Sequence, residues 1–233
     1  MPAQEWQVPN WEALKVERVF DYAKEYHSAG MNVIPLRPGE KVPAVSHWTP
    51  YRWFRQTPDM VQGLFENDHK NLGVVCGEVS GNLVVLDFDV KGRFDQLLKS
   101  HPNFQRIVAK TPVVRATRGP HVYLRTPEPV RSAKNSELGI DIQADGSYVV
   151  APPSWHPNGP QYTLEGGRSA RSFVQVYQLH DLEELGFVGL EPARLQVGGA
   201  GRPEQDEASR LLKPSLLNPL RDPLPTGQRS EAE

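Results

Sequence analysis

The segment GNLVVLDFDV at residues 81–90 constrains the fold of this 233-residue chain more than any other stretch. Its first half, residues 83–86, is an aliphatic, β-branched run that predicts a buried strand. Asp87 and Asp89 follow two positions apart, so side-chain alternation places both carboxylates on one face. Two such charges about 4 Å apart in a partly shielded site (effective dielectric constant about 20) repel by roughly 4 kcal/mol. We therefore expect a positive group beside them, and a divalent cation is the simplest candidate.

Composition and charge narrow the class of protein. With 38% hydrophobic and 23% charged residues, the chain can bury one core with a small appendage. No apolar run approaches the roughly 18 residues of a membrane span, and the first ten residues do not resemble a signal peptide, so we expect a cytoplasmic protein without membrane contact. The single cysteine, Cys76, excludes an internal disulfide and a cysteine-rich zinc site.

The character of the chain changes near residue 190. We expect residues 1–190 to form one domain. Residues 191–233 are rich in proline and glycine, which predicts a linker or disordered tail with one short helix near residues 204–212. The net charge of −2 does not by itself indicate a nucleic-acid-binding protein, but residues 106–134 contain seven Lys or Arg side chains against the single acidic residue Glu128.

Within the domain, strand patterns predict an α+β fold with a mainly antiparallel sheet, helices on one face and a polar, functional opposite face. Residues 72–76 and 82–90 are interpreted as a hairpin joined by the turn GEVSGN. Strands are also expected at 112–116, 121–126, 139–143 and 147–151. Alternation in the strand expected at 139–143 places Ile140 and Ile142 on one face and Asp141 on the other.

Four side chains near strand ends or on polar strand faces form the candidate site: Asp87, Asp89, His121 and Asp141. An isolated buried carboxylate is costly, so three near one sheet face should share cations or pair with arginine. One alternative is an ion-pair network in which Arg115, Arg118 or Arg131 neutralises the aspartates. For His121 alone, packing beside Tyr123 is the simpler interpretation. Its position after Thr-Arg-Gly-Pro, within the basic window, favours contact with a phosphate.

Three carboxylates with basic neighbours suit two-metal chemistry on a nucleotide, with Mg²⁺ or Mn²⁺ as the two ions. Arg and Lys would hold the triphosphate, and Gly119 would let the backbone approach it. The loop RPGEKVPAVSHW offers Lys41 and Arg37 as basic groups, although a pair of solvated surface charges is an equal alternative. These residues alone do not separate a polymerase from a nuclease.

Four motifs in order resemble the primase-polymerase (prim-pol) domains of the archaeo-eukaryotic primase superfamily over most of residues 1–185. MNVIPLRPGEKVPAVSHW is similar to the opening Pro-Leu, Lys-x-Pro and Trp pattern, and NLGVVCGEVSGNLVVLDFDV is similar to the first metal motif. TRGPHVYL resembles the histidine motif, and GIDIQADGSYVVAPPSWHPNGPQY resembles the third motif with its Pro-Pro-Ser extension.

The resemblance implies an RRM-like catalytic sheet joined to a smaller α/β N-terminal subdomain, the two intertwined within residues 1–190. It implies that Asp87, Asp89 and Asp141 bind two Mg²⁺ or Mn²⁺ ions. His121 would contact the incoming nucleotide's phosphates, and Ser154 and His156 would line the nucleotide pocket. Arg118 and Lys41 are added as nucleotide-binding residues by charge and loop position.

The function so implied is template-directed DNA primase and polymerase activity, with a single-stranded DNA template, a primer and nucleoside triphosphates as partners. Domains of this family are often fused to a helicase, which makes a fused or associated helicase a further candidate partner. The alternatives are a metal-dependent nuclease or an end-joining polymerase with the same carboxylates, and a non-catalytic single-strand-binding module. One departure from the family is Pro120, which lacks an N–H that would otherwise be available to a phosphate.

Overall fold

The computed structural model describes residues 18–66, 71–135 and 139–167. The tail expected at 191–233, its helix near 204–212 and the last part of the 1–190 domain lie outside the described residues. Within them the chain forms four α-helices and two antiparallel sheets, which confirms the α+β class. None of the described helices is both long enough and apolar enough to span a bilayer.

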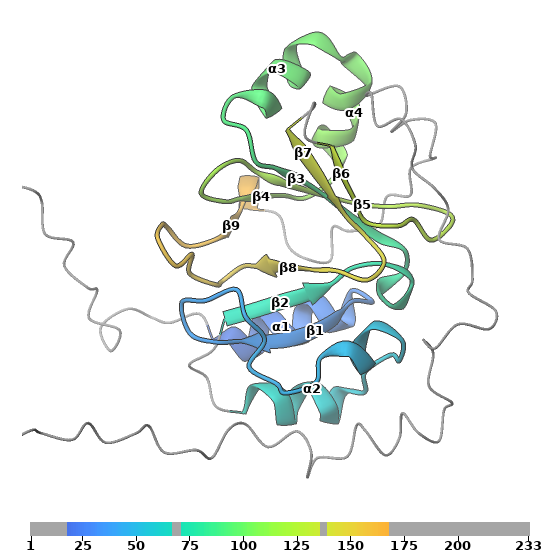
Figure 1. Ribbon diagram of the computed structural model, residues 1–233, viewed down its shortest axis with the longest axis vertical. Coiled ribbons are helices and arrows are strands. Elements are labelled where there is room, and N and C mark those ends of the chain that lie inside the picture. Colours follow the sequence, from blue (N-terminus) through green and yellow to red (C-terminus); the bar gives the residue numbers. More distant parts are fainter. Residues whose placement is uncertain (1–17, 67–70, 136–138, 168–233) are drawn as a thin grey trace, which may run out of the picture.

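The smaller sheet has three strands in the order β1-β2-β8, all antiparallel. They are β1 Asn32–Leu36, β2 Asn71–Val75 and β8 Tyr148–Ala151. Helices α1 (Val19–Ser28) and α2 (Pro58–Phe65) lie at the end of the molecule formed by this sheet (Figure 1). All residues of β1 and β2 are buried, which fits sequences that have no polar residue after the leading Asn32 and Asn71.

The larger sheet has six strands in the order β6-β7-β3-β5-β4-β9. Their bounds are β3 Leu83–Phe88, β4 Val113–Arg115, β5 His121–Arg125, β6 Ala133–Asn135, β7 Ile140–Gln143 and β9 Thr163–Leu164. Helices α3 (Arg93–Ser100) and α4 (Pro102–Lys110) cover the face turned away from the smaller sheet (Figure 1).

Alternation along β3 divides the core into two clusters. Val84, Leu86 and Phe88 point toward α3 and α4, where Phe88 packs against Phe94 and Phe104 at ring-centroid distances of 5.3 and 5.8 Å. Leu83 and Val85 point the other way, into the cluster shared with the smaller sheet, α1 and α2. Strand β3 therefore packs against both layers, one through each of its faces. Its last residues lie between the ends of the two sheets.

Two expectations from the sequence are wrong. The expected hairpin does not form: β2 pairs with β1 and β8, whereas β3 pairs with β5 and β7. Between them Glu78–Ser80 forms a 3-10 turn, and the positive φ values of Gly77 (88°) and Gly81 (70°) let the chain cross from one sheet to the other.

The helix-free face of the larger sheet is also not polar along its length. Leu83, Val85, Val114 and Tyr123 on this face are fully buried against the second sheet. Asp87, His121, Asp141 and Lys134 gather at one end of the strands on this face. The polar character predicted for the whole face is therefore concentrated at that end.

Candidate active site

Three of the predicted site residues lie in one row across the larger sheet. Asp87 on β3 is the register partner of His121 on β5 and of Asp141 on β7, and Lys134 on β6 extends the row beyond Asp141. Residues directly opposite each other in antiparallel strands point to the same face. The hydrogen-bond register thus brings together side chains that are up to 54 residues apart in the sequence.

Each aspartate faces a different basic side chain. His121 Nε2 lies 3.3 Å from Asp87 Oδ1, Arg118 Nη1 donates to Asp89 Oδ1 at 3.2 Å, and Lys134 Nζ lies 3.7 Å from Asp141 Oδ2. The Arg118 and Lys134 side chains are 68% and 87% exposed. Pairs this exposed add little to stability and exchange partners readily. The ion pairs weighed as an alternative thus form with Arg118 but not with Arg115 or Arg131.

The acidic groups of the row have opposite pKa shifts. Burial acts to raise the pKa of Asp87, but the hydrogen bond and charge of His121, helped by Lys41 and Arg118, outweigh it and the pKa is lowered. The pKa of Asp141 is raised by burial and by the nearby charges of Asp89 and Asp87, against the opposing effect of Lys134. Asp141 therefore takes up a proton more easily than Asp87 does, and a cation beside the row would favour its ionised form.

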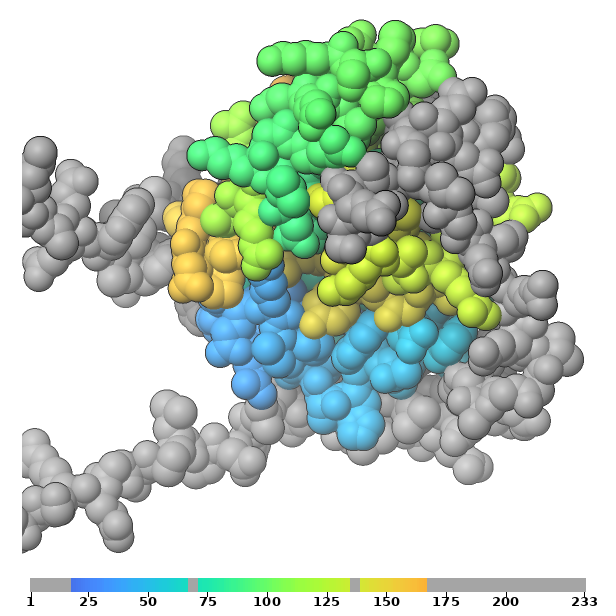
Figure 2. Space-filling model, turned by 45° about the horizontal axis from the view of Figure 1, so that its top comes forward, coloured from blue at the N-terminus to red at the C-terminus, as the bar shows by residue number. Residues whose placement is uncertain are grey.

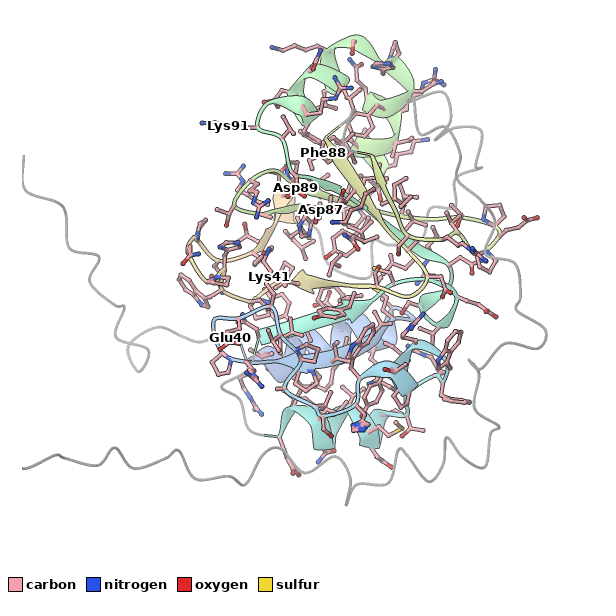
Figure 3. All side chains as sticks on the ribbon, viewed as in Figure 1. Glu40, Lys41, Asp87, Phe88, Asp89 and Lys91 are labelled. Carbon is pink, nitrogen blue, oxygen red and sulfur yellow. The ribbon has the colours of Figure 1, made fainter. Side chains whose placement is uncertain are left out.

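A cavity of about 260 Å³ opens beside the row, between the ends of the two sheets. Its charged part is lined by Asp87, Asp89, Arg118 and Lys41, together with the imidazoles of His121 and His156. The rest of the lining consists of Gln143, Tyr148, Val149, Val150, Tyr162, Ala116, Thr117 and Gly119. Asp141 lies next to the cavity through its pairing with Asp87 but is not part of its lining. Figure 3 shows Asp87, Asp89 and Lys41 on one side of the molecule, from the end of β3 and from the loop after β1.

Lys41 is held at the cavity by its backbone. The Tyr148 hydroxyl donates to the Lys41 carbonyl at 2.9 Å, and the Tyr148 ring meets the edge of Trp48 at a centroid distance of 4.9 Å. Across the cavity, the pKa of His156 is lowered by burial and then by the positive charges of Lys41 and Arg118. His156 is therefore mostly neutral at pH 7. Lys41, Arg118 and His156 all line the same cavity.

Tyr162 links the two histidines of the site. Its ring centroid lies 5.7 Å from that of His121 and 6.0 Å from that of His156. Burial, together with the charge of Asp87, raises the pKa of Tyr162 to about 12, so its hydroxyl stays protonated and can donate a hydrogen bond. Sequence reasoning missed Tyr162, Tyr148 and Gln143, because in single-sequence terms they are ordinary strand residues.

Ser154 occupies a different kind of position from the one expected. It is 1% exposed, and its hydroxyl accepts from Leu72 N at 2.7 Å and donates to Leu72 O at 3.1 Å. It does not line the cavity. Ser154 ties the segment after β8 to strand β2 and so supports the loop that carries His156.

The packing of the turn at residues 117–120 requires glycine at position 119. A Cβ at this position would overlap the carbonyl oxygen of Phe88, and the carbonyl of Pro120 accepts from Phe88 N at 3.3 Å. The turn at residues 117–120 therefore needs glycine in order to pack on the end of β3. This contact places Arg118 beside Asp89 and gives the glycine a packing role. Gly119 also lines the cavity, so its expected role beside a triphosphate stays a prediction.

The basic window at residues 106–134 does not form one surface. Arg115 pairs with Glu165 at 3.2 Å, and neither lines the cavity, while Arg125 donates to the Ala29 carbonyl at 2.8 Å, at the C-terminal end of α1. Arg106 lies on α4. Only Arg118 of the seven lines the cavity, where Lys41 from another part of the chain joins it.

The carboxylate set has the donor chemistry of Mg²⁺ and Mn²⁺, which prefer oxygen ligands. In the part of the chain that the structure describes, no three His, Cys, Asp or Glu side chains converge closely enough to hold a metal ion in this conformation. Two of the three aspartates face exposed, flexible cations instead. The three aspartates therefore have the right donor atoms for divalent ions, and Arg118 and Lys134 compete for the same oxygens.

Comparison with known proteins gives the family. Residues 23–179 match the family model described as bifunctional DNA primase/polymerase, N-terminal. The match covers more than half of the chain and includes every candidate site residue, so this chain belongs to that family. It thereby has a function of the DNA primase/polymerase type, with DNA and nucleotides as substrates. A search of curated proteins found no match.

Proposed function

We propose that this chain is a template-directed DNA primase and polymerase that transfers nucleotides from nucleoside triphosphates to a 3′-hydroxyl, or to an initiating nucleotide, with release of pyrophosphate. The observation that carries the proposal is the row Asp141-Asp87-His121 beside a cavity with basic side chains, in a member of the primase/polymerase family. Carboxylates and phosphate-binding groups that meet at one cavity are what nucleotidyl transfer requires.

Asp87, Asp89 and Asp141 would hold two divalent cations, Mg²⁺ or Mn²⁺. When bound, such ions neutralise phosphate charge and lower the pKa of an attacking hydroxyl. The proposal needs Arg118 and Lys134 to leave Asp89 and Asp141 when the ions bind. Their exposure makes this inexpensive, since exposed pairs contribute only about 0.2–1 kcal/mol.

The triphosphate would occupy the charged part of the cavity, where Lys41 and Arg118 supply positive charge and hydrogen-bond donors. His121 uses Nε2 toward Asp87, and its buried Nδ1 has no hydrogen-bond partner among the described residues. A buried ring nitrogen without a partner is costly, so a hydrogen bond from a ligand would be stabilising there. Because Nε2–H is donated to Asp87, Nδ1 accepts from a ligand donor in the neutral ring and donates to a phosphate oxygen in the imidazolium form. His156 contributes a neutral imidazole. The sugar and base would then face Gln143 and Tyr148.

Ser154 has no place in this arrangement as a direct contact, because it is buried behind the cavity wall. Its hydrogen bonds to Leu72 support the His156 loop instead. A fused or associated helicase remains a proposal from the family resemblance alone.

Incubation of the protein with a single-stranded DNA template, Mn²⁺ or Mg²⁺ and labelled nucleoside triphosphates separates the candidate functions. Labelled products longer than the supplied strand, or new primers, are the expected result. Degradation of the template without incorporation would establish a nuclease and reject the proposal. Binding of the template with neither reaction would favour a single-strand-binding module.

A further inference from the structure

Positive charge is concentrated on one helical projection of the larger sheet. We call residues 91–110, which contain α3 and α4, the helical cap. The described residues hold 16 Lys and Arg against 13 Asp and Glu, and the cap alone holds five of the former and only one of the latter. Outside the cap, described acidic residues outnumber basic ones by one, 12 to 11. The net positive charge of the described structure therefore resides in the cap.

Among the residues that the structure describes, the basic side chains of the cap have no acidic partner. Lys91, Lys99, Arg106 and Lys110 are exposed and form no salt bridge with any residue the structure describes. Arg93 donates to Gln96, a neutral side chain, at 2.8 Å. By contrast, Arg115, Arg118 and Lys134 near the sheet edge each face a carboxylate. Unpaired, exposed cations are the groups that exchange most easily onto a polyanion.

The cap begins directly at the active site. The chain leaves Asp89 and enters the cap two residues later at Lys91, which Figure 3 places close to Asp89. The cap then forms a lobe at the end of the molecule (Figure 2). At the opposite end, α1 and α2 carry one lysine, Lys24, against Asp21, Glu25 and Asp59. The molecule is thus electrostatically polar, with its basic end adjoining the aspartates.

We propose that the helical cap binds the phosphate backbone of the DNA on which the active site acts. Phosphate charge would be attracted to the free cations of the cap and repelled from the α1–α2 end, which orients the strand relative to Asp87 and Asp89. The inference rests on the proposed function for the identity of the ligand. It extends that function by naming the surface that holds the nucleic acid, which family membership does not specify.

The test compares DNA affinity of the full chain and of the triple variant Lys99→Gln, Arg106→Gln, Lys110→Gln. Glutamine has nearly the helix propensity of lysine and arginine, so α3 and α4 should persist, as thermal melting will verify. Fluorescence anisotropy with a labelled single strand, and separately with a primer–template hairpin, is measured over a range of salt without metal or nucleotide. We expect affinity at 0.1 M salt to fall about tenfold or more. The salt slope should fall by about 2 on the single strand and nearer 3 on the hairpin.

The matched control keeps the charge and changes the residues: Lys99→Arg, Arg106→Lys, Lys110→Arg should bind as the unaltered protein does. A second control, Lys24→Gln at the α1–α2 end, should leave affinity and salt slope unchanged. A greater loss on the hairpin assigns the cap to duplex phosphates, and an equal loss assigns it to the single strand. A folded triple variant with unchanged affinity and slope would overturn the inference.

Failure of this inference is distinct from failure of the proposed function. Nucleotide incorporation by the unaltered protein, together with unchanged DNA binding by the triple variant, would reject the cap and leave the polymerase proposal intact. DNA binding that depends on the cap, without nucleotide incorporation, would support the role of the cap and reject the polymerase proposal.

Discussion

Asp89 and Arg118 form an exposed contact beside the cavity. Their side chains are 41% and 68% exposed, and the guanidinium donates one hydrogen bond to the carboxylate at 3.2 Å. Arg118 also lines the cavity in which the triphosphate is proposed to lie. One arginine can therefore neutralise the carboxylate in the free protein and contact phosphate in the complex.

Replacement of Arg118 by alanine tests this exchange. Loss of the competitor for Asp89 should increase the affinity of the nucleotide-free protein for Mn²⁺ by about two- to fivefold, the equivalent of an exposed ion pair. The KM for nucleotide should rise, because a cation at the cavity is lost. Free Mn²⁺ is measured by electron paramagnetic resonance, and KM by incorporation assays. Arg115→Ala is the matched control, since Arg115 pairs with Glu165 outside the cavity. Unchanged Mn²⁺ affinity in Arg118→Ala would contradict the exchange.

The pKa of His156 reports on how closely Lys41 and Arg118 face it. Burial lowers this pKa below 6.5 first, and the two positive charges lower it further. Lys41→Ala should therefore move the pKa part of the way back toward 6.5, as followed by NMR titration of the imidazole. Because the folded pKa is depressed, the stabilisation from the neutral ring is present above about pH 6.5 and is lost as pH falls through the lowered value.

Arg37 provides the comparison for that titration. It lies in the same loop, half-exposed and near Glu40, and does not influence His156. Arg37→Ala should leave the His156 titration where it is. A His156 pKa that responds equally to both substitutions would mean that Lys41 does not face the imidazole across the cavity.

Sequence alone could predict the charged residues of the site but not the neutral ones. Asp87, Asp89 and Asp141 stand out because carboxylates at the ends or within apolar strands need a reason to be there. Tyr148, Tyr162 and Gln143 give no such signal, since an aromatic or amide in a strand is usually structural. For Ser154 the sequence motif identifies the position but not its contact. Its hydroxyl points to Leu72, and this direction depends on tertiary packing.

At the scale of elements, the turn at residues 117–120 sets the geometry of the site. It packs on the end of β3 through Gly119 and Phe88, and it carries Arg118 on one side and His121 on the other. Because the turn packs on the end of β3, it places Arg118 beside Asp89, and strand β5, which follows the turn, places His121 beside Asp87. The turn was recognisable from Gly and Pro, but its packing partner was not.

Gly119→Ala should disturb this element. The added Cβ would overlap a backbone carbonyl that cannot move without shifting β3, so we expect destabilisation of about 1–3 kcal/mol and loss of activity. Urea denaturation measures the first and nucleotide incorporation the second. Gly63→Ala in α2 is the control: it meets no atom within 4 Å, and alanine should stabilise that helix by about 0.5–1 kcal/mol. Equal stability of both variants would remove the structural role given to Gly119.

The pairing of β2 and β3 shows why the predicted hairpin is wrong. Residues 72–76 and 82–90 are both apolar and are joined by a glycine-containing turn, which locally is what a hairpin looks like. The partners β1, β5, β7 and β8 decide the pairing, and they lie far away in the sequence. Local patterns predict strands well, whereas the sheet to which a strand belongs depends on long-range contacts.

At the scale of the whole molecule, two sheets pack through one shared core, and the cavity lies where their ends diverge. The apolar part of β3 holds the layers together, and its acidic end opens into the cavity. Helices of opposite net charge cover the two outer faces. Strand β3 thereby contributes both to the core and to the proposed catalytic site.

The most direct measurement is nucleotide incorporation on a single-stranded template by the unaltered protein and by Asp87→Asn, with DNA binding measured in parallel. Asparagine preserves the size of the side chain but removes the charge that pairs with His121 and would hold a metal ion. We expect incorporation by the unaltered protein and a loss of at least about 100-fold in the variant. DNA affinity should be unchanged or slightly higher, because a charge that repels phosphate is gone. Normal incorporation by Asp87→Asn would contradict the catalytic role proposed for Asp87.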